Sequence, residues 1–206
     1  MTTRRLALAG LAGPPLFAAV ALILTAAEWD FLHNLGWSAG LLDDPDAPWP
    51  GVIALGDWAW LQVLNYLMLA ACVLGLAVAV RRTLRGPRPI GPALLALLAL
   101  AFAGSAFRTD LATARGDGPD TWNATLHIAA TTVLFPAALL AMLVFAWQFR
   151  KDERWSALSL PSAAAALLAL LTVIPALAGA RNLFFYGFLS VTLAWLALVA
   201  ARARAD

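Results

Sequence analysis

Charged residues are scarce in this chain. They make up only 13% of the 206 residues, while hydrophobic residues make up 62%. A soluble domain carries roughly 25% charged and about 45–50% apolar residues. The mean hydropathy of +0.79 also shows a chain more apolar than a soluble domain. The scarcity of charge therefore excludes an ordinary soluble domain and favours an integral membrane protein.

Cysteine, lysine and histidine are also nearly absent. Cys72 is the only cysteine, so an intrachain disulfide is impossible. Lys151 is the only lysine, and the arginines form short clusters rather than a basic face with interleaved aromatic residues, which excludes nucleic acid as a partner. The two histidines, His33 and His127, could form a zinc site only with acidic residues such as Asp110, and the spacing matches no ligand motif. We therefore predict no metal site and no cofactor.

Long apolar runs are abundant instead. A bilayer core of about 30 Å requires about 20 apolar residues in a helix, and the absence of water requires that such spans be helical. The runs show no period-two alternation, which argues against a barrel. We predict an all-α integral membrane protein with one domain over residues 1–206. Its six transmembrane helices are expected at residues 6–27, 58–80, 90–107, 123–149, 156–180 and 183–201.

The basic residues predict an orientation for these helices. In a six-span arrangement, eleven of the fourteen Lys and Arg residues lie at the termini or in the loops of one side. The positive-inside rule then places both termini in the cytoplasm. The first span could instead be a signal peptide, but its apolar run is too long and contains Pro14 and Pro15. We expect a multi-pass protein of the plasma membrane, and the Ala-, Leu- and Arg-rich composition suggests a bacterium.

One long external segment is predicted at residues 28–57. It is rich in Trp, Gly, Pro and Asp and contains no basic residue. We expect it to lie on the outer surface as a lid, with a short helix near residues 28–36. Residues of N-cap type precede or open three spans, namely Asp57, Asp120 or Thr121, and Asn182.

Polar side chains recur at helical spacing in the even-numbered spans. Each of these spans runs from outside to inside, so the polar groups all fall within roughly 10–12 Å of the outer surface. This common depth predicts a polar pocket that opens outward between spans two, four and six. The polar residues are Gln62, Asn65 and Tyr66 in span two, Asn123, His127 and Thr131 in span four, and Asn182, Tyr186 and Ser190 in span six.

A second interpretation of these residues stays open. Asn, Gln, Ser and Thr also join transmembrane helices by hydrogen bonds worth roughly 0.6–2 kcal/mol each. Such residues would hold the bundle together without forming a site. Polar groups inside a membrane are nevertheless costly, and a histidine among them favours a functional pocket.

Several short motifs resemble a known family. The first span reads "AGLAGPPLFAAVALI", span two begins with Trp60, Gln62 and Asn65 in Trp-x-Gln-x-x-Asn spacing, and Asp110 precedes His127 of span four. In this order the motifs resemble the bacterial and archaeal membrane proteins of the domain-of-unknown-function family 998. The resemblance implies about six spans over most of the chain and assigns no activity. Family members often carry a basic, Tyr-containing loop before span two, whereas this loop is acidic and Trp-rich.

Three classes of function are compatible with these features. The first is a protein that binds a membrane lipid or small amphiphile in the outward pocket, with Trp60 among its ligand-binding candidates. The second is a lipid-modifying enzyme in which Asp110 orients His127 and the imidazole moves a proton. The third is a transporter, which we rank lowest because no span carries an acid or base at mid-depth.

Overall fold

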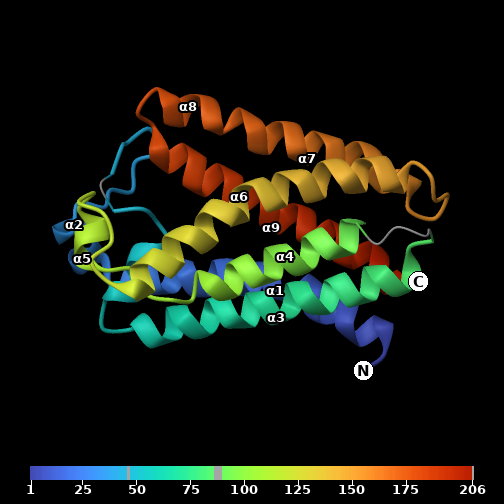
Figure 1. Cartoon of the computed structure of the whole chain (residues 1–206), viewed down its shortest axis with the longest axis horizontal. Helices are drawn as coiled ribbons and strands as arrows, with labels where there is room; N and C mark the ends of the chain where they lie inside the picture. The colour runs from blue at the N-terminus through green and yellow to red at the C-terminus, as the bar shows by residue number, and fades with distance from the viewer. Residues whose placement is uncertain (46, 86–89, 206) are drawn as a thin grey trace.

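The computed structural model of this chain describes residues 1–45, 47–85 and 90–205, which are helical apart from loops and turns. Figure 1 shows the long helices running nearly parallel along the longest axis. The predicted all-helical architecture is confirmed. The helices are α1 (Thr3–Ala27), α2 (Trp29–Asn34), η1 (Gly51–Leu55), α3 (Ala59–Thr83), α4 (Ile90–Gly104), α5 (Leu111–Ala114), α6 (Trp122–Phe149), η2 (Ser156–Leu158), α7 (Ser159–Leu171), α8 (Val173–Leu177) and α9 (Arg181–Ala205).

Five helical segments of the described chain are long and apolar enough to cross a membrane. They are α1, α3, α6, the stretch Ser156–Leu177 and α9, and their most apolar windows have mean hydropathies of 2.1 to 2.3. The chain is therefore a multi-pass membrane protein. The stretch predicted as span three forms the shorter helix α4, which has 15 residues and is about 22 Å long. The stretch predicted as span five is divided into η2, α7 and α8, with a break at Thr172.

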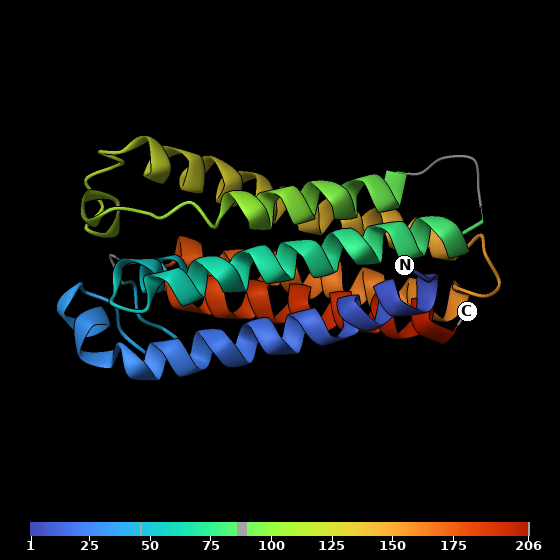
Figure 2. The same ribbon diagram turned by 90° about the horizontal axis from the view of Figure 1, so that it is seen from below.

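The six helical segments form a ring. The neighbouring pairs are α1 and α3, α3 and α4, α4 and α6, α6 and α7, α7 and α9, and α9 and α1. Figures 1 and 2 show that both chain termini lie at one end of this bundle, while α2 and α5 lie at the other. We call these the terminal end and the cap end.

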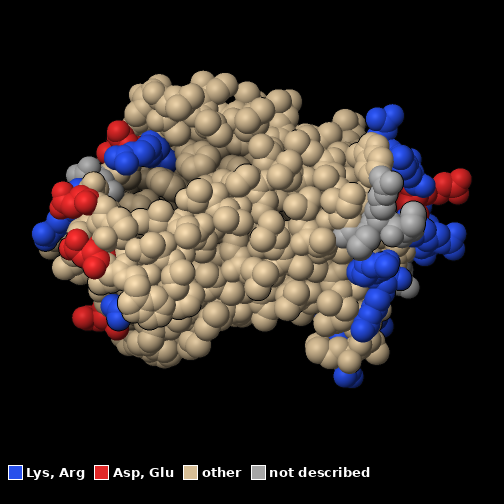
Figure 3. All heavy atoms as spheres, viewed as in Figure 1, with Lys and Arg blue, Asp and Glu red and all other residues tan. Residues whose placement is uncertain are grey.

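Charged side chains gather at the two ends of the bundle. On the face shown in Figure 3, Lys and Arg dominate the terminal end, Asp and Glu are more frequent at the cap end, and the surface between them carries no charge. This uncharged band is the surface expected of a protein surrounded by hydrocarbon. Arg88, one of the basic residues used to predict the orientation, lies outside the described residues.

Much of the described part of residues 28–57, which we call the cap segment, folds into the end of the bundle. Val52, Ile53 and Ala54 are fully or almost fully buried, although the sequence suggested a lid lying on the surface. The segment is fastened at both ends, because Glu28 accepts a hydrogen bond of 2.8 Å from the backbone N–H of Trp58. The expected short helix is confirmed as α2. The cap segment is therefore part of the packed core of the cap end.

The helix starts differ in part from the predicted caps. Thr121 caps α6 through its hydroxyl, as expected for one of the two candidates. Asp57 does not cap α3. Trp58 occupies the N-cap position of this helix, and its backbone N–H donates to the carboxylate of Glu28. Asn182 lies inside α9 and bonds the cap segment instead. A carboxylate distant in sequence has taken the role that Asp57 was expected to fill.

Small residues set the spacing between α1 and its neighbours. A Cβ atom at Gly13 would lie 2.5 Å from the Cβ of Cys72 in α3, which is closer than atoms can pack. A Cβ atom at Gly10 would lie 2.9 Å from the Cβ of Leu76. The two glycines therefore allow α1 and α3 to approach each other closely. These two helices both contribute to the wall of the cavity described next.

Candidate functional site

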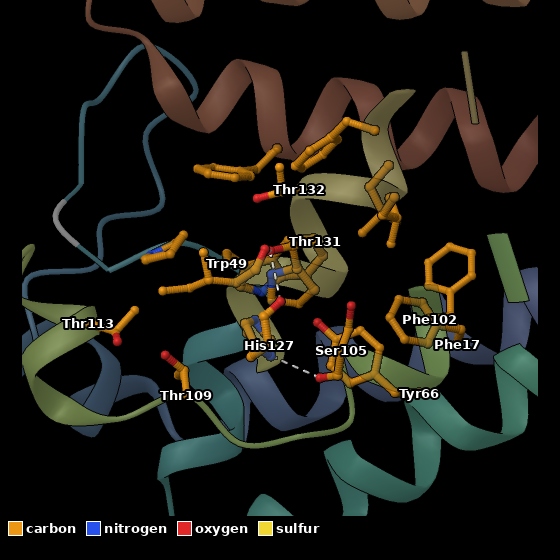
Figure 4. Close-up of a pocket in the computed structure, with 18 residues that line it drawn as sticks. Phe17, Trp49, Tyr66, Phe102, Ser105, Thr109, Thr113, His127, Thr131 and Thr132 are labelled. Carbon is orange, nitrogen blue, oxygen red and sulfur yellow. Dashed lines mark hydrogen bonds between the residues drawn. The ribbon is translucent and has the colours of Figure 1, made fainter. Parts of the chain in front are cut away.

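A cavity of about 410 Å³ lies inside the ring at the cap end. Figure 4 shows its lining side chains, which come from α1, α3, α4, α5, α6 and α9, from the loop between α4 and α5 and from the cap segment. Part of the wall is aromatic and aliphatic, consisting of Phe17, Phe102, Ile128, Leu134, Phe135, Phe185 and Leu189. The cap segment covers it with Pro48, Trp49, Pro50 and Gly51. The polar part consists of Tyr66, Ser105, Thr109, Thr113, His127, Thr131 and Thr132.

The described lining contains no Asp, Glu, Lys or Arg. A charged ligand group would therefore have no opposite charge beside it, and burying an unpaired charge is costly. Among the described residues, no group of three or more His, Cys, Asp or Glu side chains gathers in a way that could hold a metal ion. The chemistry available in the cavity is hydrogen bonding by hydroxyls and one imidazole.

His127 is held in place by the end of α4. Its Nδ1 lies 3.0 Å from the carbonyl oxygen of Ser105 and 2.8 Å from that of Phe107. These carbonyls follow the last helical residue, Gly104, where backbone oxygens lack partners within the helix. Because carbonyl oxygens only accept, Nδ1 carries the proton and donates to both. The histidine thereby ties α6 to α4, and in the neutral ring its Nε2 is left as an acceptor.

Gly51 gives this second nitrogen its space. A Cβ atom at Gly51 would lie 2.8 Å from Nε2 of His127. Both residues line the cavity, and Nε2 makes no hydrogen bond among the described residues. The absence of a side chain at Gly51 therefore allows the cap segment to pass over the imidazole.

Asp110 has a local structural role. Its carboxylate accepts hydrogen bonds from the backbone N–H groups of Thr113, Asp120 and Thr121 and from the Thr121 hydroxyl, at 2.8 to 3.0 Å. Desolvation acts to raise the pKa of Asp110, but hydrogen bonds from Thr113 and Thr121 outweigh it and hold the pKa below its ordinary value. None of its hydrogen bonds within the described chain reaches His127. The acid–base pair suggested by the sequence is thus replaced by a clamp across the turn between α5 and α6.

The residues predicted for one pocket are divided among several places. Tyr66, His127 and Thr131 line the cavity. Tyr186 and Ser190 line a second cavity of about 370 Å³ between α1, α9 and the cap segment. Neither cavity is lined by Trp60, which is 56% exposed, or by Asn123.

Two of the predicted residues, Asn65 and Asn182, hold elements together instead. Asn65 donates to the backbone oxygen of Phe17 at 3.0 Å, which joins α3 to α1, and to the side chain of Gln62 in its own helix at 3.2 Å. Asn182 donates to the backbone oxygens of Ser38 and Gly40, at 2.8 and 2.9 Å, which joins α9 to the cap segment. These residues therefore bond neighbouring elements, as the second interpretation of the polar residues suggested, and do not line the cavity.

The sequence analysis missed part of the cavity wall. Spans one and three were expected to contribute nothing, yet Phe17, Phe102 and Ser105 come from α1 and from the end of α4. Trp49 belongs to the segment predicted to lie on the outer surface, but it is buried and separates the two cavities, since it lines both. The sequence Pro48–Gly51 indicates a turn, but it does not indicate which helices that turn covers.

Comparison with known proteins identifies the family of the chain. No curated protein and no solved structure matches the chain. A family model does match, and it covers residues 11–202, which include every described residue of the cavity lining. The chain therefore belongs to the family described as Protein of unknown function (DUF998).

Proposed function

We propose that this protein binds a lipid or small amphiphile in the cavity at its cap end. The cavity itself is the observation that carries the proposal. Its volume of about 410 Å³ falls in the range of roughly 300–1,000 Å³ that is typical of small-molecule sites. Such sites combine an apolar wall with a few polar groups, as Phe17, Phe102 and Phe185 do here with His127 and the neighbouring hydroxyls.

The surroundings of the cavity favour a ligand taken from the membrane. The band between the charged ends is apolar, so the molecules in contact with it are lipids. Thr132 lines the cavity and is also exposed on α6, so the cavity reaches the surface of the bundle. An amphiphile in the adjoining leaflet would therefore have the cavity within reach.

The membrane arrangement is part of the proposal. We infer six spans, with α4 as the shortest, because α4 lies between α3 and α6 in the ring and is apolar throughout. The basic terminal end faces the cytoplasm by the positive-inside rule, and the cap end faces outward. The plasma membrane of a bacterium fits this arrangement, and membrane lipids are then the partners.

The enzymatic alternative has lost its main support. It required Asp110 to orient His127, whereas the Asp110 carboxylate bonds Thr113, Asp120 and Thr121. Backbone carbonyls orient the imidazole instead. A transporter gains no support either, because no Asp, Glu, Lys or Arg side chain lines either of the two cavities in the described chain.

Native mass spectrometry of the purified protein tests the proposal. We expect a bound lipid or amphiphile to remain with the wild-type protein and to be lost from Thr131→Trp, whose indole would fill the cavity. Thr125→Trp is the matched control, because Thr125 is exposed on the same helix and does not line the cavity. Equal retention by the two variants would show that the bound molecule lies elsewhere and would contradict the proposal.

Labelling with a membrane-impermeant maleimide tests the six spans. In a Cys72→Ala background, single cysteines replace Asp117, between α4 and α6, and Glu153, between α6 and α7. Six spans with cytoplasmic termini predict labelling of position 117 in intact cells and of position 153 only after the membrane is opened. Labelling of both positions from the same side would show that α6 does not cross the membrane, and the reverse pattern would show that the orientation is wrong.

A further inference from the structure

The part of the cavity wall around His127 presents hydrogen-bond acceptors to a ligand. The inference concerns the headgroup of the ligand and rests on the proposed function. Nδ1 of His127 donates to two backbone carbonyls, which leaves Nε2 as an acceptor without a protein partner in the described chain. The lining therefore contains at least one nitrogen that only a donor can satisfy.

Two hydroxyls beside the imidazole also act as hydrogen-bond acceptors toward the cavity. Ser105 donates to the backbone oxygen of Ala101 at 2.9 Å. Thr131 donates within its own helix, at 3.0 Å, to the backbone oxygens of His127 and Ile128. Each hydroxyl has one hydrogen, which these bonds use, so the oxygens offer only lone pairs to the cavity. Figure 4 shows Ser105, His127 and Thr131 close together near the centre of the view.

The absence of charged side chains from the lining further restricts the chemical class of the ligand. The lining has no arginine or lysine to hold a carboxylate or phosphate and no acid to hold an ammonium group. A doubly protonated His127 would itself be an unpaired buried charge, because Asp110 is bonded elsewhere. An ether or ester oxygen has no hydrogen to donate, so its lone pairs would face the lone pair of Nε2 without forming a hydrogen bond.

We propose that the ligand is an uncharged amphiphile with a hydroxyl headgroup, whose O–H donates to Nε2 of His127. The alcohol oxygen then lies in the cavity beside Nε2, and the hydrocarbon part lies against Phe17, Phe102 and Phe185. Fatty alcohols, isoprenoid alcohols and acylglycerols with a free hydroxyl share this chemistry. Fatty acids, phospholipid headgroups and alkylammonium ions do not.

A set of matched decyl compounds tests the headgroup. Protein held in amphipol is titrated with 1-decanol, decyl methyl ether, decanoate and decyltrimethylammonium, and the bound fraction is measured by native mass spectrometry. A neutral hydrogen bond is worth about 0.5–1.5 kcal/mol, so we expect decanol to bind up to about tenfold more tightly than the ether. The two ionic compounds should bind more weakly than decanol.

Variants at the imidazole identify the partner of the hydroxyl. In His127→Asn the amide N–H can still donate to the carbonyls of Ser105 and Phe107, but the acceptor at Nε2 is gone, so the preference for decanol over the ether should disappear. His33→Asn is the matched control at an exposed histidine outside the cavity and should keep the preference. If His127→Asn does not fold, Gly51→Ala gives a second test, because its methyl group would occlude Nε2 while the imidazole stays.

The outcomes separate this inference from the proposed function. If wild-type protein binds the ether as tightly as decanol, or binds decanoate most tightly, the headgroup inference is wrong while the ligand cavity stands. If none of the four compounds binds and no lipid is retained on purification, the proposed function fails together with it. If the preference for decanol survives in His127→Asn, or in Gly51→Ala where His127→Asn does not fold, the hydroxyl does not meet the imidazole and the inference is wrong.

Discussion

The indole Nε1 of Trp49 donates a hydrogen bond of 2.9 Å to the hydroxyl of Thr25. This bond fastens the cap segment to the first long helix at a buried position. Trp49 also packs edge-on against Tyr186 of α9, with ring centroids 5.2 Å apart. Trp49, from the segment predicted to lie on the outer surface, is thus at the centre of the cap end, in contact with α1, α9 and both cavities.

Loss of the Thr25 hydroxyl should loosen the cap segment. Thr25→Val keeps the shape of the side chain but leaves the buried indole N–H without an acceptor, which costs about 1–3 kcal/mol. Reversible unfolding in detergent should show this decrease in the free energy of unfolding. Thr125→Val is the matched control, because Thr125 is exposed and bonds only the preceding turn of its own helix. An equal effect of the two substitutions would mean that the bond between Thr25 and Trp49 contributes nothing specific.

Removal of the Trp49 side chain should join the two cavities. Trp49 lines both the cavity of about 410 Å³ and that of about 370 Å³. Trp49→Ala is expected to shift the preference from a decyl to a hexadecyl alcohol, measured as bound fractions by native mass spectrometry. Trp49→Phe keeps a ring between the cavities and loses only the N–H, so it should retain the wild-type preference. If neither variant changes the chain-length preference, Trp49 does not limit the space available to the ligand.

Asp110 should stabilise the fold at neutral pH and lose this effect in acid. Its pKa is lower in the folded protein than in the unfolded chain, so the stabilisation is complete above the ordinary pKa of Asp, about 3.9, and falls as pH decreases through the folded value. Asp110→Asn should therefore lower the melting temperature at pH 7, with a difference from wild type that narrows below about pH 4. The control is Asp117→Asn, an exposed acid in the same turn. A difference that does not depend on pH would show that the charge of Asp110 is unimportant.

Asn182 should hold part of the cap segment to α9. Its amide donates to the backbone oxygens of Ser38 and Gly40, and its own backbone N–H donates to Asp43. Asn182→Ala removes the two side-chain bonds, so hydrogen exchange of the amides in residues 37–44 should accelerate. Asn123→Ala should leave that exchange unchanged, because Asn123 makes no side-chain hydrogen bond among the described residues and lies on α6. Acceleration in both variants would indicate a general loss of stability rather than a lost local contact.

The sequence by itself determined the membrane class, the location of the apolar helices, the distribution of basic residues and the family. These properties follow from composition and from runs of about 20 residues, which act locally because each span must satisfy its own backbone in lipid. His127 and Thr131 were also correctly expected to share one face, since helical spacing fixes that relationship.

The tertiary structure alone decided what each polar group contacts. Asp110 and His127 are 17 positions apart and were considered as an acid–base pair, but α5 and the turn after it give the carboxylate three backbone N–H groups, and the end of α4 gives the imidazole two carbonyls. Trp49 and Gly51 reach the cavity only because the cap segment folds into the ring. Hydrogen bonds are short and directional, so spacing along the chain cannot choose among partners that the fold brings together from distant helices.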